Sequence, residues 1–274
     1  MDLGKVFVEA TDIHLPARFL DARFDLMDAE KGQALYDEGH IAGALYVDLE
    51  KHLSDMNKVE SGRHPMPEKD QLLAWMEQYG LAAEERIYIY DQGGAPFAAR
   101  AYYMLAYAGF TNIAIVNGGY DALVEAGFDV TTEVPTVTAT AFDPDWQEEL
   151  YAERAYVRSI VEGEQERALL LDARAAIRYR GEHEPLDPVA GHIPTAQNLD
   201  WELLKDGKKL IVKDDLLAAV PKEQEVVVYC GSGVTASPLY TVLKEAGYER
   251  VRVYVGSFSD WINEHEVATG EEVK

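Results

Sequence analysis

Short apolar runs alternate along this chain with longer stretches in which apolar residues recur at helical spacing. Runs rich in Val, Ile, Leu and Tyr predict buried strands at 17–23, 86–91, 112–119, 168–174, 225–230 and 250–256. Helical patterns lie between them at 68–80, 96–109 and 237–247. Alternating strands and helices predict an α/β fold in which each mostly parallel sheet is flanked by helices.

The same pattern occurs twice. Three matched pairs keep their order: FLDAR at 19–23 with LLDAR at 170–174, EGHIAGALYVD at 38–48 with AGHIPTAQNLD at 190–200, and RIYIYDQGGAPFA at 86–98 with EVVVYCGSGVTAS at 225–237. A polar insertion in the first copy, at 51–67, explains the one change in spacing. We therefore predict two tandem domains, at 1–127 and 151–274, joined by a linker at 128–150.

Charge and cysteine content limit the possible functions. A formal charge of -24 disfavours nucleic acid and anionic membranes as partners. The chain shows neither an apolar run of bilayer length nor a basic-then-apolar N-terminal segment, so we expect no membrane span and no secretory signal. A single cysteine cannot form an internal disulfide, a CxxC redox pair, a zinc ribbon or a cysteine-ligated iron–sulfur cluster. These features together favour a cytoplasmic protein.

The single cysteine, Cys230, differs between the two copies. The DAR and GHI motifs occur in both copies and are interpreted as structural, whereas Cys230 has Asp91 as its counterpart. In CGSGVTA, small residues follow a predicted strand and precede a predicted helix, so backbone N–H groups are able to surround the sulfur. Such a loop stabilises a thiolate or a persulfide anion. The alternative is a small, inert buried thiol.

Two reaction classes use a cysteine loop of this kind. A cysteine-dependent phosphatase needs arginine at the end of a C-x5-R motif, and this chain has Ala236 there. Sulfur transfer needs a nucleophile and N–H groups around an anion but no cation at that position. The loop therefore favours a sulfurtransferase over a phosphatase. A non-enzymatic binding module of the same fold has no use for the cysteine.

These motifs resemble those of the tandem-domain rhodanese family, and CGSGVTA resembles the loop of the 3-mercaptopyruvate sulfurtransferases. The resemblance covers about residues 6–263. It implies a catalytic second domain and a non-catalytic first domain, with Asp91 in place of cysteine. Thiosulfate sulfurtransferases of this fold typically carry Arg-Lys after the cysteine, whereas this chain has Gly231 and Ser232.

The resemblance also implies site residues. Cys230 is the sulfur carrier, and the rest of its loop binds substrate through Gly231, Gly233, Val234 and Thr235, of which Thr235 caps the helix or orients the loop. Arg178 and Arg180 correspond to the segment that binds the substrate carboxylate, with a surface pair as the alternative. The family's second arginine corresponds to Leu186, so that contact is absent or supplied elsewhere.

A proton relay is implied as well. Asp48 and His64 resemble the acid and imidazole that pair with a loop serine, here Ser232. A turn-capping role before Pro65 is the alternative for His64.

The implied reaction moves sulfur from 3-mercaptopyruvate to Cys230 and then to a thiol, such as thioredoxin or glutathione, or to cyanide. No metal and no cofactor are expected. Thiosulfate is the alternative donor.

Overall fold

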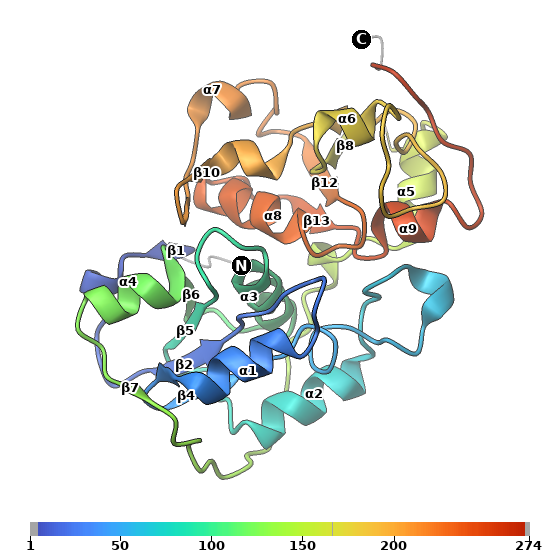
Figure 1. The fold of residues 1–274 in the computed structure, drawn as a ribbon. Helices are drawn as coiled ribbons and strands as arrows, with labels where there is room; N and C mark the ends of the chain where they lie inside the picture. The colour runs from blue at the N-terminus through green and yellow to red at the C-terminus, as the bar shows by residue number, and fades with distance from the viewer. Residues whose placement is uncertain (1–4, 166, 272–274) are drawn as a thin grey trace. The chain divides into compact units, whose positions relative to one another are not determined.

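The computed structural model describes residues 5–165 and 167–271, which divide into two compact units (Figure 1). Unit 1 contains the residues up to Asp55, Pro67–Gln147 and Lys205–Leu210. Unit 2 contains Met56–Met66, Glu148–Leu204 and the residues from Ile211 onward. No helix in the described part of the chain is long and apolar enough to cross a membrane.

Unit 1 is built on a five-stranded parallel sheet. The strand order is β1 (Phe7–Val8), β6 (Ile113–Val116), β5 (Ile87–Tyr90), β2 (Arg18–Asp21) and β4 (Ala44–Tyr46). Its helices are α1 (Lys31–Glu38), α2 (Lys69–Gln78), α3 (Phe97–Tyr107) and α4 (Gly119–Glu125). A short antiparallel pair joins β3 (His40–Ile41) to β7 (Val130–Thr131).

Unit 2 repeats this plan with four parallel strands. Their order is β13 (Val251–Val253), β12 (Glu225–Tyr229), β8 (Ala168–Asp172) and β9 (Gln197–Asn198). The helices are α5 (Arg154–Val161), α6 (Ala176–Tyr179), α7 (Asp214–Leu217), α8 (Ala236–Glu245) and α9 (Ser257–Trp261). Single 3-10 turns occur at Ala10–Asp12, Val59–Ser61, Glu148–Leu150 and Trp201–Leu204.

The predicted α/β fold with flanked parallel sheets is confirmed. All six predicted strands form, each shorter than its apolar run, because the runs continue into the loops. Tyr88 and Tyr90 of β5 pack with Leu123 of α4 in one cluster, while Ile87 and Ile89 point to the other face and are fully buried. Both faces of a parallel sheet are covered by helices, which explains the continuous rather than alternating apolar runs.

Each unit takes one short segment from the other half of the sequence. Residues 56–66 lie in the polar insertion of the first copy but belong to unit 2. The hairpin formed by β10 (Lys205–Asp206) and β11 (Lys209–Leu210) belongs to unit 1, where Asn117 Nδ2 donates to Leu210 O at 2.9 Å. The predicted domains at 1–127 and 151–274, with the linker at 128–150, stay a prediction. They divide the sequence into consecutive blocks, so they do not include the two short segments that each unit takes from the other half.

Candidate active site

Cys230 lies directly after β12, at the carboxyl end of the unit 2 sheet, and is 1% exposed. The start of α9 holds its backbone in place. Cys230 N donates to Ser257 Oγ at 3.1 Å, Phe258 N donates to Cys230 O at 3.0 Å, and Ser259 N donates to Gly231 O at 2.9 Å. The strand and α9 therefore fix the position of the thiol before any substrate binds.

A backbone N–H group points at the sulfur. Gly233 N donates to Cys230 Sγ at 3.1 Å, and Ser257 Oγ lies 4.0 Å from the same atom. Gly233 has φ +77°, and a Cβ there would lie 2.2 Å from Val255 O. Only glycine fits this left-handed, crowded position. An N–H group aimed at sulfur stabilises negative charge on a thiolate or persulfide.

The equivalent loop of unit 1 surrounds a carboxylate. Asp91 follows β5 as Cys230 follows β12, and its oxygens accept from Gly93 N at 2.8 Å and Ala98 N at 3.0 Å. Burial nevertheless raises the pKa of Asp91 to about 6, against the lowering effect of these N–H groups. The duplicated loop thus directs its N–H groups at an acidic side chain in one copy and at a thiol in the other.

His64 and Ser232 lie together in unit 2. His64 Nδ1 lies 2.9 Å from Ser232 Oγ, and Ser232 is 7% exposed. The segment that carries His64 is held on unit 2 by two further bonds: Arg63 N donates to Ser259 Oγ at 3.1 Å, and Asn263 Nδ2 donates to Glu60 O at 3.0 Å. The structure thus brings these two predicted residues into hydrogen-bond contact, and their role in a proton relay stays a prediction.

Asp48 lies in unit 1, after β4. Its Oδ1 accepts from Glu50 N at 2.9 Å and Lys51 N at 3.0 Å, and Lys51 Nζ lies 3.3 Å from Oδ2. Asp48 N donates to His52 Nδ1 at 2.9 Å. Asp48, Lys51 and His52 also line a cavity of about 540 Å³. The role of Asp48 as the acid of the relay stays a prediction.

The two arginines predicted to bind substrate lie in different surroundings. Glycine has no Cβ atom, and we call the position that such an atom would occupy on its backbone the Cβ point. Arg178, in α6, places Nη2 3.4 Å from the Cβ point of Gly231. Its guanidinium donates to Glu184 at 2.9 and 2.7 Å. Arg180 pairs with Glu182 at 2.7 Å and with Glu271 at 3.5 Å. Arg178 therefore lies beside the loop of Cys230, while substrate binding by either arginine stays a prediction.

The remaining loop residues, Val234 and Thr235, directly precede α8. Val234 is 1% exposed, and its carbonyl accepts from Ser237 N at 3.2 Å. Thr235 occupies the N-cap position but makes no side-chain capping bond. Its φ of -78° and ψ of -3° are helical, whereas a capping side chain needs extended backbone. The capping role expected of Thr235 is therefore wrong, and a loop-orienting role stays a prediction.

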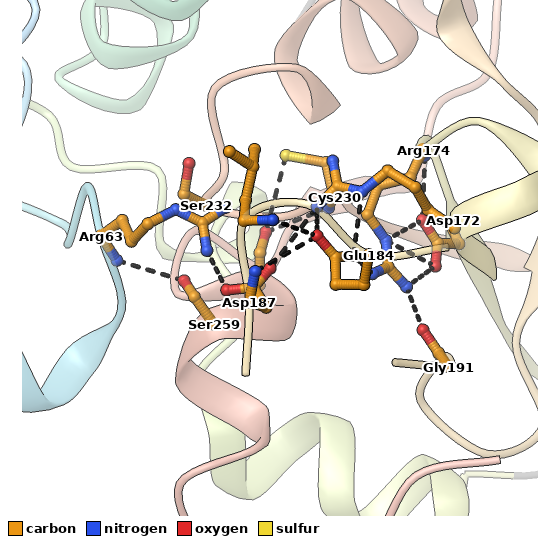
Figure 2. Close-up of polar contacts among 12 residues, drawn as sticks. Arg63, Asp172, Arg174, Glu184, Asp187, Gly191, Cys230, Ser232 and Ser259 are labelled. Carbon is orange, nitrogen blue, oxygen red and sulfur yellow. Dashed lines mark hydrogen bonds and ion pairs between the residues drawn. The ribbon is translucent and has the colours of Figure 1, made fainter. Parts of the chain in front are cut away.

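The sequence reasoning missed Arg63, Glu184 and Asp187. The Arg63 guanidinium forms an ion pair with Asp187 (Figure 2). Arg63 Nη2 lies 2.7 Å from the Cβ point of Gly231. Arg178 Nη2 lies 3.5 Å from Asp187 Oδ2. Arg63 directly precedes His64 in GRHPMP, so adjacency to a candidate residue was the available signal.

Two carboxylates balance these cations. Burial raises the pKa of Asp187 above its usual value, although Arg63 and Arg178 oppose the rise. Burial acts in the same direction on Glu184, but hydrogen bonds from Arg178 and from backbone N–H groups hold its pKa below the usual value. Among the residues that the structure describes, no three His, Cys, Asp or Glu side chains gather in a way that could hold a metal ion.

Comparison with known proteins places this site in context. A family model described as "Rhodanese-like domain" matches residues 9–126 and 154–264. A probable 3-mercaptopyruvate sulfurtransferase of Pseudomonas aeruginosa is 38% identical over 264 residues, which is 92% of this chain and 92% of that protein. A putative thiosulfate sulfurtransferase of Mycobacterium tuberculosis is 34% identical over 90% of this chain and 88% of its own length.

A solved structure has the same fold. The crystal structure of the Escherichia coli 3-mercaptopyruvate sulfurtransferase aligns with a TM-score of 0.78 and 26% identity, covering 93% of this chain and 100% of that one.

Proposed function

We propose that this chain, which belongs to the rhodanese-like domain family, is a sulfurtransferase that takes sulfur from 3-mercaptopyruvate and carries it as a persulfide on Cys230. One observation carries the proposal. The sulfur of Cys230 lies at the end of β12 with Gly233 N–H aimed at it, and Arg178 lies beside the next residue, Gly231. A nucleophile and an anion-stabilising donor thus lie in one loop, and α6 places a cation beside that loop to bind the donor carboxylate.

The first half-reaction breaks the carbon–sulfur bond of the donor. The donor carboxylate binds near Arg178, and the Cys230 thiolate attacks the donor sulfur, forming a sulfur–sulfur bond. The bonding electrons of the carbon–sulfur bond move onto carbon, so pyruvate leaves as its enolate. The Gly233 N–H stabilises the persulfide that remains on Cys230. A carboxylate–guanidinium pair holds the donor in one orientation for this attack.

The enolate carbon needs a proton. We assign its delivery to the Ser232 hydroxyl, which is re-protonated through His64 at 2.9 Å, with Asp48 as the acid of the relay. In the second half-reaction, an acceptor thiolate or cyanide attacks the outer sulfur and restores the Cys230 thiolate. Thioredoxin, glutathione and cyanide are the acceptors to test. We place the reaction in the cytoplasm, where such thiols are kept reduced.

Replacement of the carrier tests the proposal. Cys230→Ser should lose turnover with every donor, because a serine hydroxyl cannot hold a labile sulfur. Wild-type protein treated with donor alone should gain the mass of one sulfur atom on the peptide that contains Cys230. Normal turnover in the serine variant would rule the mechanism out.

Thiosulfate is a second candidate donor. The specific observation in its favour is that two guanidinium groups, from Arg63 and Arg178, lie beside Gly231, where a compact dianion needs positive charge. Values of kcat/KM for the two donors, measured side by side with cyanide as the acceptor, decide between them. We expect 3-mercaptopyruvate to have the higher value, and a higher value for thiosulfate would reverse the assignment.

A further inference from the structure

We infer that Arg63 is a second donor-binding cation of this site and that it occupies the space which a side chain at position 231 would fill. The inference rests on the proposed function, because the donor is the anion that Arg63 would bind. Residues 56–66 would then contribute Arg63 to the site in addition to His64. It also supplies the second cation that the sequence lacks at Leu186.

The position of the guanidinium supports this role. Arg63 Nη2 lies 2.7 Å from the Cβ point of Gly231, and Arg178 Nη2 lies 3.4 Å from the same point. Gly231 directly follows Cys230, so both cations lie one residue from the nucleophile. Gly231 shows no left-handed φ, so its backbone does not require glycine. The lack of a side chain at position 231 instead leaves room for the two guanidinium groups.

Asp187 keeps Arg63 in this position. It pairs with Arg63 through Oδ1 (Figure 2). Its Oδ2 lies 3.5 Å from Arg178 Nη2, so one carboxylate joins both arginines. The Asp187 side chain is only 3% exposed, whereas that of Arg63 is 34% exposed. A guanidinium has five N–H donors, so Arg63 is able to keep Asp187 and still donate to a donor anion.

Position 186 does not supply this charge. Leu186 is 55% exposed, on the loop between Glu184 and Asp187. Arg63 comes from a distant part of the sequence, yet its backbone N–H is bonded to Ser259, whose own N–H holds Gly231 O. The segment and the catalytic loop are therefore attached to the same turn of α9, which fixes the distance between Arg63 and Cys230.

Alkylation of the single cysteine tests the inference without any sulfur donor. Iodoacetate carries a carboxylate and iodoacetamide does not, and the Cys230 thiolate displaces iodide from either one. The ratio of their rates therefore reports the attraction of an anion to this site. Arg63→Ala should lower the ratio roughly ten-fold or more, which corresponds to one charge-assisted hydrogen bond. Arg63→Lys should lower the ratio less than Arg63→Ala does, because lysine keeps the positive charge.

The matched control is Arg158→Ala. Arg158 is an exposed arginine of α5 in unit 2 that pairs with Glu162, the residue after this helix, and its loss should leave the ratio unchanged. An unchanged ratio in Arg63→Ala, or an equal fall in Arg158→Ala, would overturn the inference. If the ratio falls in Arg63→Ala but no donor loads sulfur onto wild-type Cys230, the anion site stands and the proposed function fails.

A second variant keeps the test decisive if Arg63→Ala does not fold. Gly231→Ala adds a Cβ that would meet Arg63 Nη2 at 2.7 Å, so it should displace the guanidinium and lower the ratio in the same way. In the double variant the two effects should not multiply, because both remove one interaction. Effects that multiply fully would show that Gly231 and Arg63 act independently and would contradict the inference.

Discussion

At the scale of single residues, the two glycines that flank Ser232 serve different purposes. Gly231 has an ordinary backbone, and its missing side chain leaves space for Arg63 and Arg178. Gly233 has φ +77°, and its N–H donates to the sulfur of Cys230. Alanine at either position adds the same single carbon, but only at Gly233 does it oppose both the backbone conformation and the carbonyl of Val255.

Gly233→Ala should therefore destabilise unit 2 more than Gly231→Ala does. A left-handed conformation costs alanine roughly 1–2 kcal/mol, and the close approach to Val255 O adds to this. We expect a loss of at least about 2 kcal/mol in the free energy of unfolding, measured by urea denaturation. Gly231→Ala, the matched control, should lose clearly less, because its Cβ meets only the end of the flexible Arg63 side chain. Equal stability of the two variants would contradict this explanation.

Asp91 predicts a pH dependence of stability. Burial raises the pKa of Asp91 to about 6 in the folded chain, above its ordinary value of 3.8. A raised folded pKa means that the contribution of Asp91 to stability is fully present below about pH 3.8 and is lost as pH rises through about 6. The loss is about 3 kcal/mol, at roughly 1.4 kcal/mol per pKa unit.

The difference between wild type and Asp91→Asn isolates this carboxylate from the many other acids. Between pH 4 and pH 7, the free energy of unfolding should fall more for wild type than for Asp91→Asn. The difference should approach about 3 kcal/mol. Parallel curves for the two proteins would show that Asp91 keeps an ordinary pKa when folded.

His64 contacts Ser232 through a side chain on a surface segment, so its loss should affect chemistry rather than folding. His64→Ala should lower the rate of the donor half-reaction roughly 100-fold, the lower range for loss of a general acid–base group. The thermal midpoint should stay nearly constant. Cyanide should discharge preloaded persulfide at the wild-type rate, since that step needs no carbon protonation. A lower thermal midpoint with unchanged activity would favour the capping role.

At the scale of elements, strands and long helices followed directly from local pattern. The six apolar runs became β2, β5, β6, β8, β12 and β13, and the three helical patterns became α2, α3 and α8. Two-residue strands such as β1 and β7 were not predicted, because two residues carry no periodicity. The same holds for Arg63: the loop 56–66 is polar and irregular, and its position depends on bonds to Ser259 and Asn263 far along the chain.

The Asp–Arg pair that occurs in both copies makes the same contacts at the end of β2 in unit 1 and at the end of β8 in unit 2. Arg23 Nη2 lies 2.6 Å from Asp21 Oδ2 and donates to Gly39 O at 2.8 Å. Arg174 Nη2 lies 2.6 Å from Asp172 Oδ2 and donates to Gly191 O at 2.7 Å. Each pair ties its strand to the loop that begins the GHI motif, as expected of a feature shared by both copies.

Removal of one charge should leave a buried guanidinium without its partner. Asp21→Asn should cost roughly 3–5 kcal/mol of unfolding free energy. Asp172→Asn should cost less, because Arg174 Nη1 also lies 3.2 Å from Glu184. Urea denaturation of both variants, with Asp28→Asn at an exposed position as a control for loss of one charge, measures the difference. A larger loss for Asp172→Asn would show that Glu184 does not compensate.

At the scale of the whole molecule, each copy of the repeat contributes one short segment to the unit that is formed mainly by the other copy. After β4, the first copy sends residues 56–66 to unit 2, where Arg63 lies beside the loop of Cys230. After β9, the second copy sends its hairpin to unit 1, where Lys208 Cβ lies 2.9 Å from the Cβ point of Gly93 in the loop of Asp91. Each loop is thus covered by a segment from the other half of the sequence. Only one of the two segments supplies an arginine.

This asymmetry predicts that a thiol alone does not make a second active site. In Asp91→Cys/Cys230→Ser, the new thiol would follow β5 in a loop of the same kind. The repeat counterpart of Arg178 is Met27, however, which is 88% exposed, and Lys208 of the covering hairpin is paired with Asp121. The described atoms nearest to a Cβ at Gly93 or Gly94 belong to Gly118, Gly207 and Lys208 and not to an arginine, so we expect the donor carboxylate to bind weakly at this loop.

We expect the double variant to show no turnover above the Cys230→Ser background and no sulfur on the peptide that contains residue 91 after treatment with 3-mercaptopyruvate. Asp91→Cys alone should keep wild-type activity, which shows that the substitution leaves unit 2 intact. Iodoacetamide labelling at residue 91 confirms that the new thiol is accessible. If the double variant gained sulfur at residue 91 at a rate near that of wild type, the loop N–H groups would be sufficient for sulfur transfer, and neither Arg63 nor Arg178 would be needed to bind the donor.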